Sequence, residues 1–170
     1  MEYMIRQARM EDLDGVAEVE YICFPPAEAA DKASLQKRLE VFPDSFFVAE
    51  IEDGKIIGFI NGAVTDERTI RDEMFENADL HKKDGRYQSI FGLDVLPEYQ
   101  RQGVAASLLE HFIKTAEKRG KNGVILTCKE GLIPYYSRFG FKNLGVSGSV
   151  HGGAVWYDMV IENICGADSR

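Results

Sequence analysis

The segment Leu93–Ser107, with the sequence LDVLPEYQRQGVAAS, begins like a buried strand, breaks at a proline and resumes at once as a helix. A plain connection would need neither the bare backbone of Gly103 nor the three hydrogen-bonding side chains before it, Gln100, Arg101 and Gln102. The N-terminus of a helix presents about four free N–H groups and roughly half a positive charge. Glycine lets an anion approach that backbone closely, and Arg101 adds a counter-charge. We therefore expect this turn to hold a pyrophosphate, although spacing alone also allows an ordinary strand-to-helix turn.

The composition is that of an ordinary globular chain. A length of 170 residues predicts a single domain over residues 1–170. Apolar residues make up 45% of the chain and charged residues 28%, which argues against intrinsic disorder. The net charge of −8 disfavours nucleic acid as a partner, because nucleic-acid-binding proteins carry basic patches. Such an acidic chain attracts cationic small molecules weakly, and salt screens that attraction.

The three cysteines, Cys23, Cys128 and Cys165, form no CxxC pair and no cluster with histidine. The sequence therefore indicates neither a disulfide framework nor a metal site. It contains no apolar run of about 18 residues and no apolar signal core at its start, so we expect no membrane partner. A cytoplasmic, reduced protein is the simplest interpretation.

Hydrophobic periodicity predicts seven strands and four helices. Strands are expected over residues 2–8, 87–96 and 123–128 and in two hairpins, 45–65 and 142–162. Helices are expected over residues 10–24, 33–42, 104–120 and 131–140. The polar segment 66–86 is expected to be a long loop that carries a short helix. Asp53-Gly54 is a strong signal for the turn of the first hairpin. This order of elements predicts a mixed sheet flanked by helices.

Two sequence patterns point to a known family. Gln100–Ala105 (QRQGVA) resembles the Q/R-x-x-G-x-G/A signature of the GNAT superfamily of acyl-CoA N-acyltransferases. Tyr136–Phe141 (YSRFGF) matches Y-x-x-x-G-F, a second hallmark of that superfamily, and the resemblance covers almost the whole chain. It implies an α/β (α+β) fold in which a mixed, mostly antiparallel central sheet of about seven strands is flanked by about four helices.

Within the superfamily, the chain is most similar to arylalkylamine (serotonin-type) N-acetyltransferases. Their run C-E-D-A-L-V-P-F-Y-x-R-F-x-F resembles Cys128–Phe141 (CKEGLIPYYSRFGF), and the end of their first helix resembles YICFPP. The resemblance places Phe24, Pro25 and Phe91 at the substrate. Those enzymes carry two histidines, two residues apart, on the strand before the turn. Ser89 and Phe91 occupy the matching positions here, so the base that acts through those histidines is missing.

The resemblance also implies acetyl-CoA as cosubstrate. The backbone of Leu93, Asp94 and Val95 is expected to pair with the pantetheine arm like an added strand. The pyrophosphate is expected to bind the turn and the first helical residues: Gln100, Arg101, Gln102, Gly103, Val104, Ala105, Ala106 and Ser107. Tyr136 matches the tyrosine that donates a proton to the departing sulfur, and its neighbour Tyr135 is expected only to pack.

The group that takes the proton of the amine is open at this point. His151 lies in the last hairpin loop, which borders the substrate in this fold, although a lone loop histidine is more often solvated. Ser89 could instead hold a water molecule that deprotonates the amine. Asp94 could titrate, although alternation along the strand turns it from the face that bears Phe91 and Leu93. Glu20 and the nearby Glu28 could hold a cationic amine, but solvation at the surface is the more common role of such acids. Tyr136, Ser89 and His151 thus form the candidate catalytic set.

Three functions fit these patterns. The first is direct transfer of an acetyl group from acetyl-CoA to a small primary amine in a ternary complex, by a monomer or homodimer. The second is acetylation of protein N-termini or lysines, which requires an open groove. The third is a non-catalytic acyl-CoA sensor, which the missing histidine pair favours and the retained Tyr136 disfavours.

Overall fold

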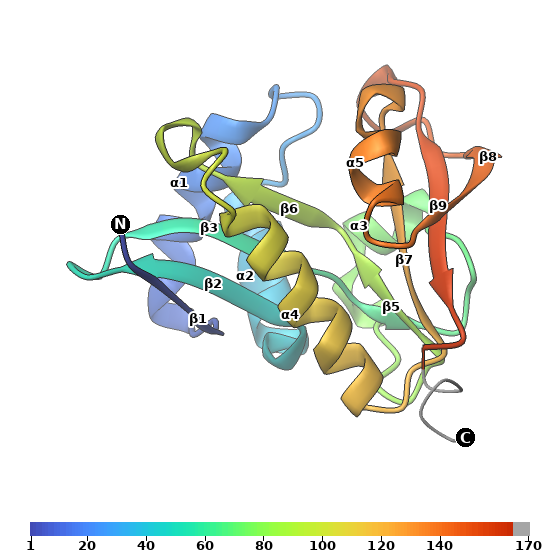
Figure 1. Cartoon of the computed structure of the whole chain (residues 1–170), viewed down its shortest axis with the longest axis horizontal. Helices are drawn as coiled ribbons and strands as arrows, with labels where there is room; N and C mark the ends of the chain where they lie inside the picture. Colours follow the sequence, from blue (N-terminus) through green and yellow to red (C-terminus); the bar gives the residue numbers. More distant parts are fainter. Residues whose placement is uncertain (165–170) are drawn as a thin grey trace. The chain divides into compact units, whose positions relative to one another are not determined.

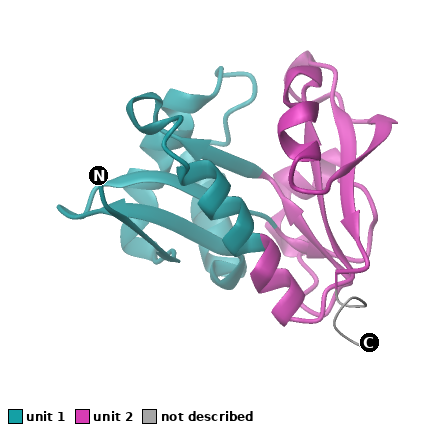
Figure 2. Cartoon of the chain, viewed as in Figure 1, with its two compact units in different colours: residues 1–62, 92–112 teal, residues 63–91, 113–170 magenta. Residues whose placement is uncertain are grey.

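The structure is a computed structural model that describes residues 1–164, so Cys165 lies outside the described residues. The chain divides into two compact units, residues 1–62 with 92–112 and residues 63–91 with 113–170, which Figure 2 shows in different colours. Each unit combines an early and a late part of the sequence. The single domain that the chain length indicates stays a prediction.

Unit 1 contains a four-stranded antiparallel sheet in the order β1-β2-β3-β6 (Figure 1). Its strands are β1 (Tyr3–Gln7), β2 (Phe46–Ile51), β3 (Ile56–Asn61) and β6 (Gly92–Val95). The hairpin between β2 and β3 turns at Asp53-Gly54: Gly54 has a φ of 89°, and the Lys55 N–H donates to Asp53 Oδ1 at 3.0 Å. The helices α1 (Leu13–Cys23) and α2 (Lys32–Val41) pack against each other, and α1 also packs on β3 and β6.

Unit 2 contains a five-stranded sheet in the order β4-β5-β7-β9-β8, in which only the β5–β7 pair is parallel. Its strands are β4 (Val64–Thr65), β5 (Tyr87–Ile90), β7 (Gly123–Cys128), β8 (Lys142–Val146) and β9 (Tyr157–Glu162). The short helices α3 (Asp72–Glu76) and α5 (Ile133–Ser137) belong to this unit. A buried cluster joins α3 to the sheet and comprises Ile70, Met74, Tyr87, Ile125 and Val160.

The helix α4 (Val104–Lys118) contributes residues to both units, since the boundary falls between Phe112 and Ile113. Its buried residues recur at the spacing that places them on one face: Val104, Leu108, Leu109, Phe112 and Ala116. Short 3₁₀ helices cover Met10–Asp12, Pro43–Ser45, Ala78–Leu80, Pro97–Tyr99, Glu130–Leu132 and His151–Gly153. None of the helices between residues 1 and 164 is long and apolar enough to cross a membrane.

The predicted fold class is confirmed, but the number of elements differs: the described residues form nine strands and five α-helices. The main difference is the single strand expected over residues 87–96, which is two strands in two sheets. β5 pairs with β4 and β7, whereas β6 pairs with β3, and the chain leaves strand geometry between them at Phe91. Both strands mix apolar with polar or small residues, and only the apolar Phe91 lies between them, so periodicity alone could not separate them.

Candidate active site

The turn between β6 and α4 contains two residues with left-handed backbone, Arg101 with a φ of 63° and Gly103 with a φ of 86°. A β-carbon on Gly103 would meet nothing within 4 Å, so the left-handed φ, and not crowding, favours glycine there. The Ser107 N–H donates to the Gly103 carbonyl oxygen at 3.0 Å and is the first i→i−4 donor of α4. The N–H groups before it therefore point out of the helix end, where anions are stabilised.

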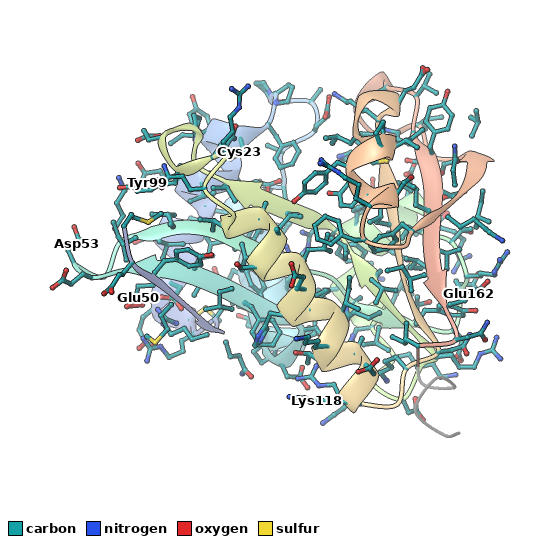
Figure 3. The ribbon with its side chains drawn as sticks, viewed as in Figure 1. Cys23, Glu50, Asp53, Tyr99, Lys118 and Glu162 are labelled. Atoms are coloured by element: carbon teal, nitrogen blue, oxygen red, sulfur yellow. The ribbon has the colours of Figure 1, made fainter. Side chains whose placement is uncertain are left out.

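The glutamines of the turn hold its backbone. Gln100 Nε2 donates to the Val95 carbonyl oxygen at 2.9 Å, and Gln102 Nε2 donates to the Glu98 carbonyl oxygen at 3.3 Å. The Val95 carbonyl oxygen also accepts from Cys23 Sγ at 3.3 Å, which ties the end of α1 to the end of β6. Figure 3 labels Cys23 at this point. These contacts fix the path from strand to helix.

Tyr3 on β1 also reaches this turn, and sequence reasoning missed it. Its hydroxyl lies 2.7 Å from Ser107 Oγ, with either oxygen able to donate, and 3.5 Å from the Gly103 carbonyl oxygen. The two residues are 104 positions apart in sequence, so no local pattern joins them. The hydroxyl pair orients Ser107 at the start of α4.

β6 is the last strand of the four-stranded sheet, because β3 is its one partner among the described strands. The residues expected to bind an extended ligand, Leu93, Asp94 and Val95, thus lie on an edge strand, and an edge strand can pair with an added chain through its backbone. Phe24 and Pro25 directly follow α1 in the same unit, and the Phe24 N–H closes the helix on the Glu20 carbonyl oxygen at 3.1 Å. The turn, the edge strand and this loop therefore all belong to unit 1.

The predicted catalytic residues belong to unit 2. Tyr136 on α5 is 9% exposed, and its ring contacts Tyr135 and Phe141 edge-on, at centroid distances of 5.3 and 5.8 Å. Tyr135 is less buried and contacts Phe139 and the Arg138 guanidinium. The two tyrosines therefore differ in environment, and the roles expected for them stay predictions.

Ser89 is completely buried on β5, and its hydroxyl donates to the Ala63 carbonyl oxygen at 2.6 Å. Its backbone N–H donates to the same oxygen at 2.9 Å. The hydroxyl proton of Ser89 is thus used in a hydrogen bond to the backbone. The hydroxyl oxygen could still accept a further hydrogen bond through its lone pairs. Its role as a holder of water stays a prediction.

His151 belongs to a row of ring contacts in unit 2, which we call the aromatic row: Phe91, Phe75, His151 and Trp156. The ring centroids of Phe91 and Phe75 are 4.9 Å apart. The rings of Phe75 and His151 are nearly parallel, with centroids 5.2 Å apart, and the centroids of His151 and Trp156 are 6.0 Å apart. Phe75 lies in the polar segment 66–86, where no signal indicated a site residue. The row joins two residues that were predicted separately, Phe91 and His151.

Unit 1 also holds a buried charged cluster that the sequence did not predict. Glu20 was expected to be solvated, but it is 6% exposed, and its Oε2 accepts from the Ala30 N–H at 2.8 Å. Asp94 is 2% exposed, and burial beside the Glu20 carboxyl raises its pKa well above the ordinary range for aspartate. The expectation for Glu20 was wrong because a helix places every third or fourth residue on the buried face regardless of its charge.

Comparison with known proteins adds to this geometry. The model of the acetyltransferase (GNAT) family matches residues 11–141. Serotonin N-acetyltransferase of Mesocricetus auratus is 27% identical over 95 residues, which are 55% of this chain and 44% of that protein. This chain thus spans less than half the length of that relative. An N-alpha-acetyltransferase of Sulfurisphaera tokodaii is 26% identical over 149 residues, which are 85% of this chain and 83% of that protein.

Solved structures share the fold. The loading GNATL domain of CurA from Lyngbya majuscula superimposes with a TM-score of 0.80 at 18% identity, over 95% of this chain and 98% of that one. Ard1 from Thermoplasma volcanium superimposes with a TM-score of 0.74 at 19% identity, over 95% and 98% of the two chains. At these sequence identities the similarity shows a shared fold and nothing about activity or substrate.

Proposed function

We propose, because this chain belongs to the acetyltransferase (GNAT) family, that it transfers an acetyl group from acetyl-CoA to a primary amine by direct attack in a ternary complex. The observation that carries the proposal is the left-handed turn at Arg101 and Gly103, which joins an edge strand to the start of a 15-residue helix. That sequence of elements suits a ligand with an extended arm and a charged diphosphate.

In this proposal the N–H groups around Gly103 bind the pyrophosphate of CoA, and Arg101 supplies a positive charge. The edge of β6 that no strand within residues 1–164 occupies pairs with the amide groups of the pantetheine arm, as an added strand does. The Ser107 hydroxyl, oriented by Tyr3, offers one further hydrogen bond to a phosphate oxygen. A PaiA N-acetyltransferase from Thermoplasma acidophilum, which shares the fold at a TM-score of 0.71, was solved in complex with coenzyme A.

Tyr136 supplies the acid in this proposal. Collapse of the tetrahedral intermediate breaks the carbon–sulfur bond, and the phenol proton of Tyr136 passes to the CoA thiolate as it leaves. The ring is held on two sides by Tyr135 and Phe141, which limits the directions in which its hydroxyl can point.

A small amine is our preferred acceptor. The aromatic row supports this choice, because it presents ring surface against which a small organic amine could pack. Protein N-termini are the second candidate, and the relative named N-alpha-acetyltransferase, which matches along most of both chains, favours it.

Release of free thiol from acetyl-CoA tests the proposal directly. We expect release with at least one member of a panel of small primary amines, and slower release with peptides of varied N-terminus. Faster release with peptides would instead establish the second candidate. Tight binding of acetyl-CoA with no release on either panel would show a non-catalytic sensor.

A further inference from the structure

The loop 147–156, which connects β8 to β9 in unit 2, exposes its valines and buries its serines. Val150 and Val155 are 74% and 61% exposed, whereas Ser147 and Ser149 are buried. Burial of apolar side chains is the dominant favourable term in folding, and these valines contribute little of it. Hydrogen bonds must therefore account for much of the order of this loop.

Asp72, the first residue of α3, binds this loop with both carboxylate oxygens. The Ser149 hydroxyl donates to Oδ1 at 2.5 Å, and the Val150 N–H donates to Oδ2 at 3.0 Å. The two donors lie 77 and 78 positions from Asp72, so the carboxylate joins distant segments of the same unit. Hydrogen bonds to a charged acceptor are stronger than neutral ones, and two of them also fix the orientation of the bound segment.

The hydroxyl of Ser149 extends this contact to His151. The His151 N–H donates to Ser149 Oγ at 3.2 Å, while the Ser149 proton is used in the bond to Asp72. The carbonyl oxygen of His151 accepts from Trp156 Nε1 at 2.8 Å. The backbone of His151 is thus held at both of its polar groups, and a chain of two hydrogen bonds connects its N–H to Asp72.

The helix α3 holds the ring of His151 as well as its backbone. Phe75 lies three residues after Asp72 and therefore on the same side of the helix. Its ring stacks on the imidazole of His151, with centroids 5.2 Å apart and planes inclined by 19°. The four rings of the aromatic row are half-buried, so part of their surface is open. Asp72 and Phe75 together fix where the imidazole lies in that row.

We propose that Asp72 is a positioning residue for the acceptor: it fixes the loop 147–156 so that His151 and Phe75 form one surface on which the acceptor amine binds. The inference rests on the proposed function, in which the aromatic row binds the acceptor. Asp72 touches no reacting atom in this role, because its effect passes through Ser149 and the loop. When the loop is released, only a fraction of the molecules presents the surface, and the apparent affinity for the amine falls by that fraction.

A split between KM and kcat tests this role. In Asp72→Ala, KM for the acceptor amine should rise by ~10–100-fold, about the effect of losing one part-buried hydrogen bond to a charged group. At saturating amine, kcat should change by less than ~2-fold, because the bound amine selects the molecules whose loop is ordered. The affinity for acetyl-CoA, whose proposed site belongs to unit 1, should be unchanged.

The chain offers a matched control and a conservative pair of substitutions. Glu76 is an exposed acid on the same helix, so Glu76→Gln should keep the wild-type KM. Ser149→Ala should raise KM to a similar extent as Asp72→Ala, whereas Ser149→Thr keeps a hydroxyl and should restore most of the affinity for the amine. Because Asp72 and Ser149 act through one contact, the double alanine variant should be little worse than the poorer single variant.

Trp156 supplies a readout that needs no turnover, because it is the single tryptophan of the chain and its indole N–H donates to His151. In Asp72→Ala and Ser149→Ala the emission maximum should shift to longer wavelength as the loop moves into water, and acrylamide should quench the emission more strongly. Glu76→Gln and Ser149→Thr should emit like the wild type.

Two results would overturn the proposal. The first is a KM for amines in Asp72→Ala and Ser149→Ala that equals that of Glu76→Gln, and the second is unchanged Trp156 emission in both alanine variants. A fall in kcat at constant KM would contradict it as well, since Asp72 would then act in the chemical step.

Failure of the proposed function gives a different result. An amine panel without thiol release from the wild type would contradict that function, and the amines would then be titrated against Trp156 emission. Tighter amine binding by the wild type than by Asp72→Ala would still support the acceptor surface. Equal affinities, or no binding, would overturn it.

Discussion

At the scale of single residues, Tyr136 and Tyr135 offer a matched comparison. Tyr136→Phe removes one hydroxyl and keeps the buried ring, so the melting temperature and acetyl-CoA affinity should change little. kcat should fall by at least ~10²-fold, because the proton is needed in the transition state and not for binding in the ground state. Tyr135→Phe is the control and should retain turnover. Equal kinetics for the two variants, measured by thiol release, would show that Tyr136 is structural.

A second prediction concerns how Asp94 makes the stability of the fold depend on pH. Because its pKa is raised in the folded state, the folded chain binds that proton more tightly than the unfolded chain does. The contribution of Asp94 to stability is therefore full below about pH 4, its unfolded pKa, and is lost as the pH rises toward the folded pKa. Asp94→Asn lacks this loss. As the pH rises from about 4 toward the folded pKa of Asp94, the melting temperature of Asp94→Asn minus that of the wild type should therefore increase by ~3–5 °C per pH unit.

The measurement is a series of thermal unfolding curves from acidic to neutral pH, with Glu18→Gln as the exposed control. The control should follow the wild type throughout. A melting-temperature difference between Asp94→Asn and the wild type that does not vary with pH would contradict the raised pKa.

The residue scale also shows where sequence reasoning ends. The turn residues Gln100–Gly103 could be found because their pattern is contiguous, and the structure places them in one turn. The contact of Tyr3 with Ser107, and that of Glu20 with Asp94, depend on strand register and helix packing between distant segments. No spacing in the sequence encodes those contacts, so they could not be predicted from periodicity.

At the scale of elements, the glycines at the two ends of α4 allow a controlled comparison of two Gly→Asp substitutions. Gly103 and Gly120 both have a left-handed φ, and a β-carbon on either would meet nothing within 4 Å. Aspartate tolerates that conformation, so each Gly→Asp change adds the same charge at similar strain. Gly103→Asp should weaken acetyl-CoA binding by ~5–150-fold, through bulk and like charge at the proposed phosphate site.

Gly120→Asp lies beyond the opposite end of the helix and should leave the calorimetric affinity for acetyl-CoA unchanged. It should lower the melting temperature slightly, because a negative charge opposes the dipole at a helix C-terminus. Unchanged affinity in a folded Gly103→Asp protein would remove the turn from the binding site.

Elements with a strong period were predicted well, and α4 begins at the residue expected from its apolar stripe. The stretch 87–96 was predicted less well, because two short strands of mixed composition follow each other with only the apolar Phe91 between them. Pairing partners, not local propensity, decide that β5 joins β7 and β6 joins β3. The segment 66–86 was expected to carry a short helix, and α3 lies there; its Phe75 contacts the predicted residues Phe91 and His151.

At the scale of the whole molecule, the net charge of −8 sets a long-range field that should assist a cationic acceptor. Added salt screens this field, since the Debye length falls from about 30 Å at 0.01 M to about 3 Å at 1 M. We expect kcat/KM for a cationic amine to fall by at least ~3-fold across that range, a small effect beside the 10–10³-fold of strongly focused fields.

An alkoxyamine, which is neutral at the assay pH, is the control and should show no such fall. An equal response of both acceptors would mean that salt acts on acetyl-CoA binding or on the fold, and the same titration followed by calorimetry with acetyl-CoA alone would separate those two causes.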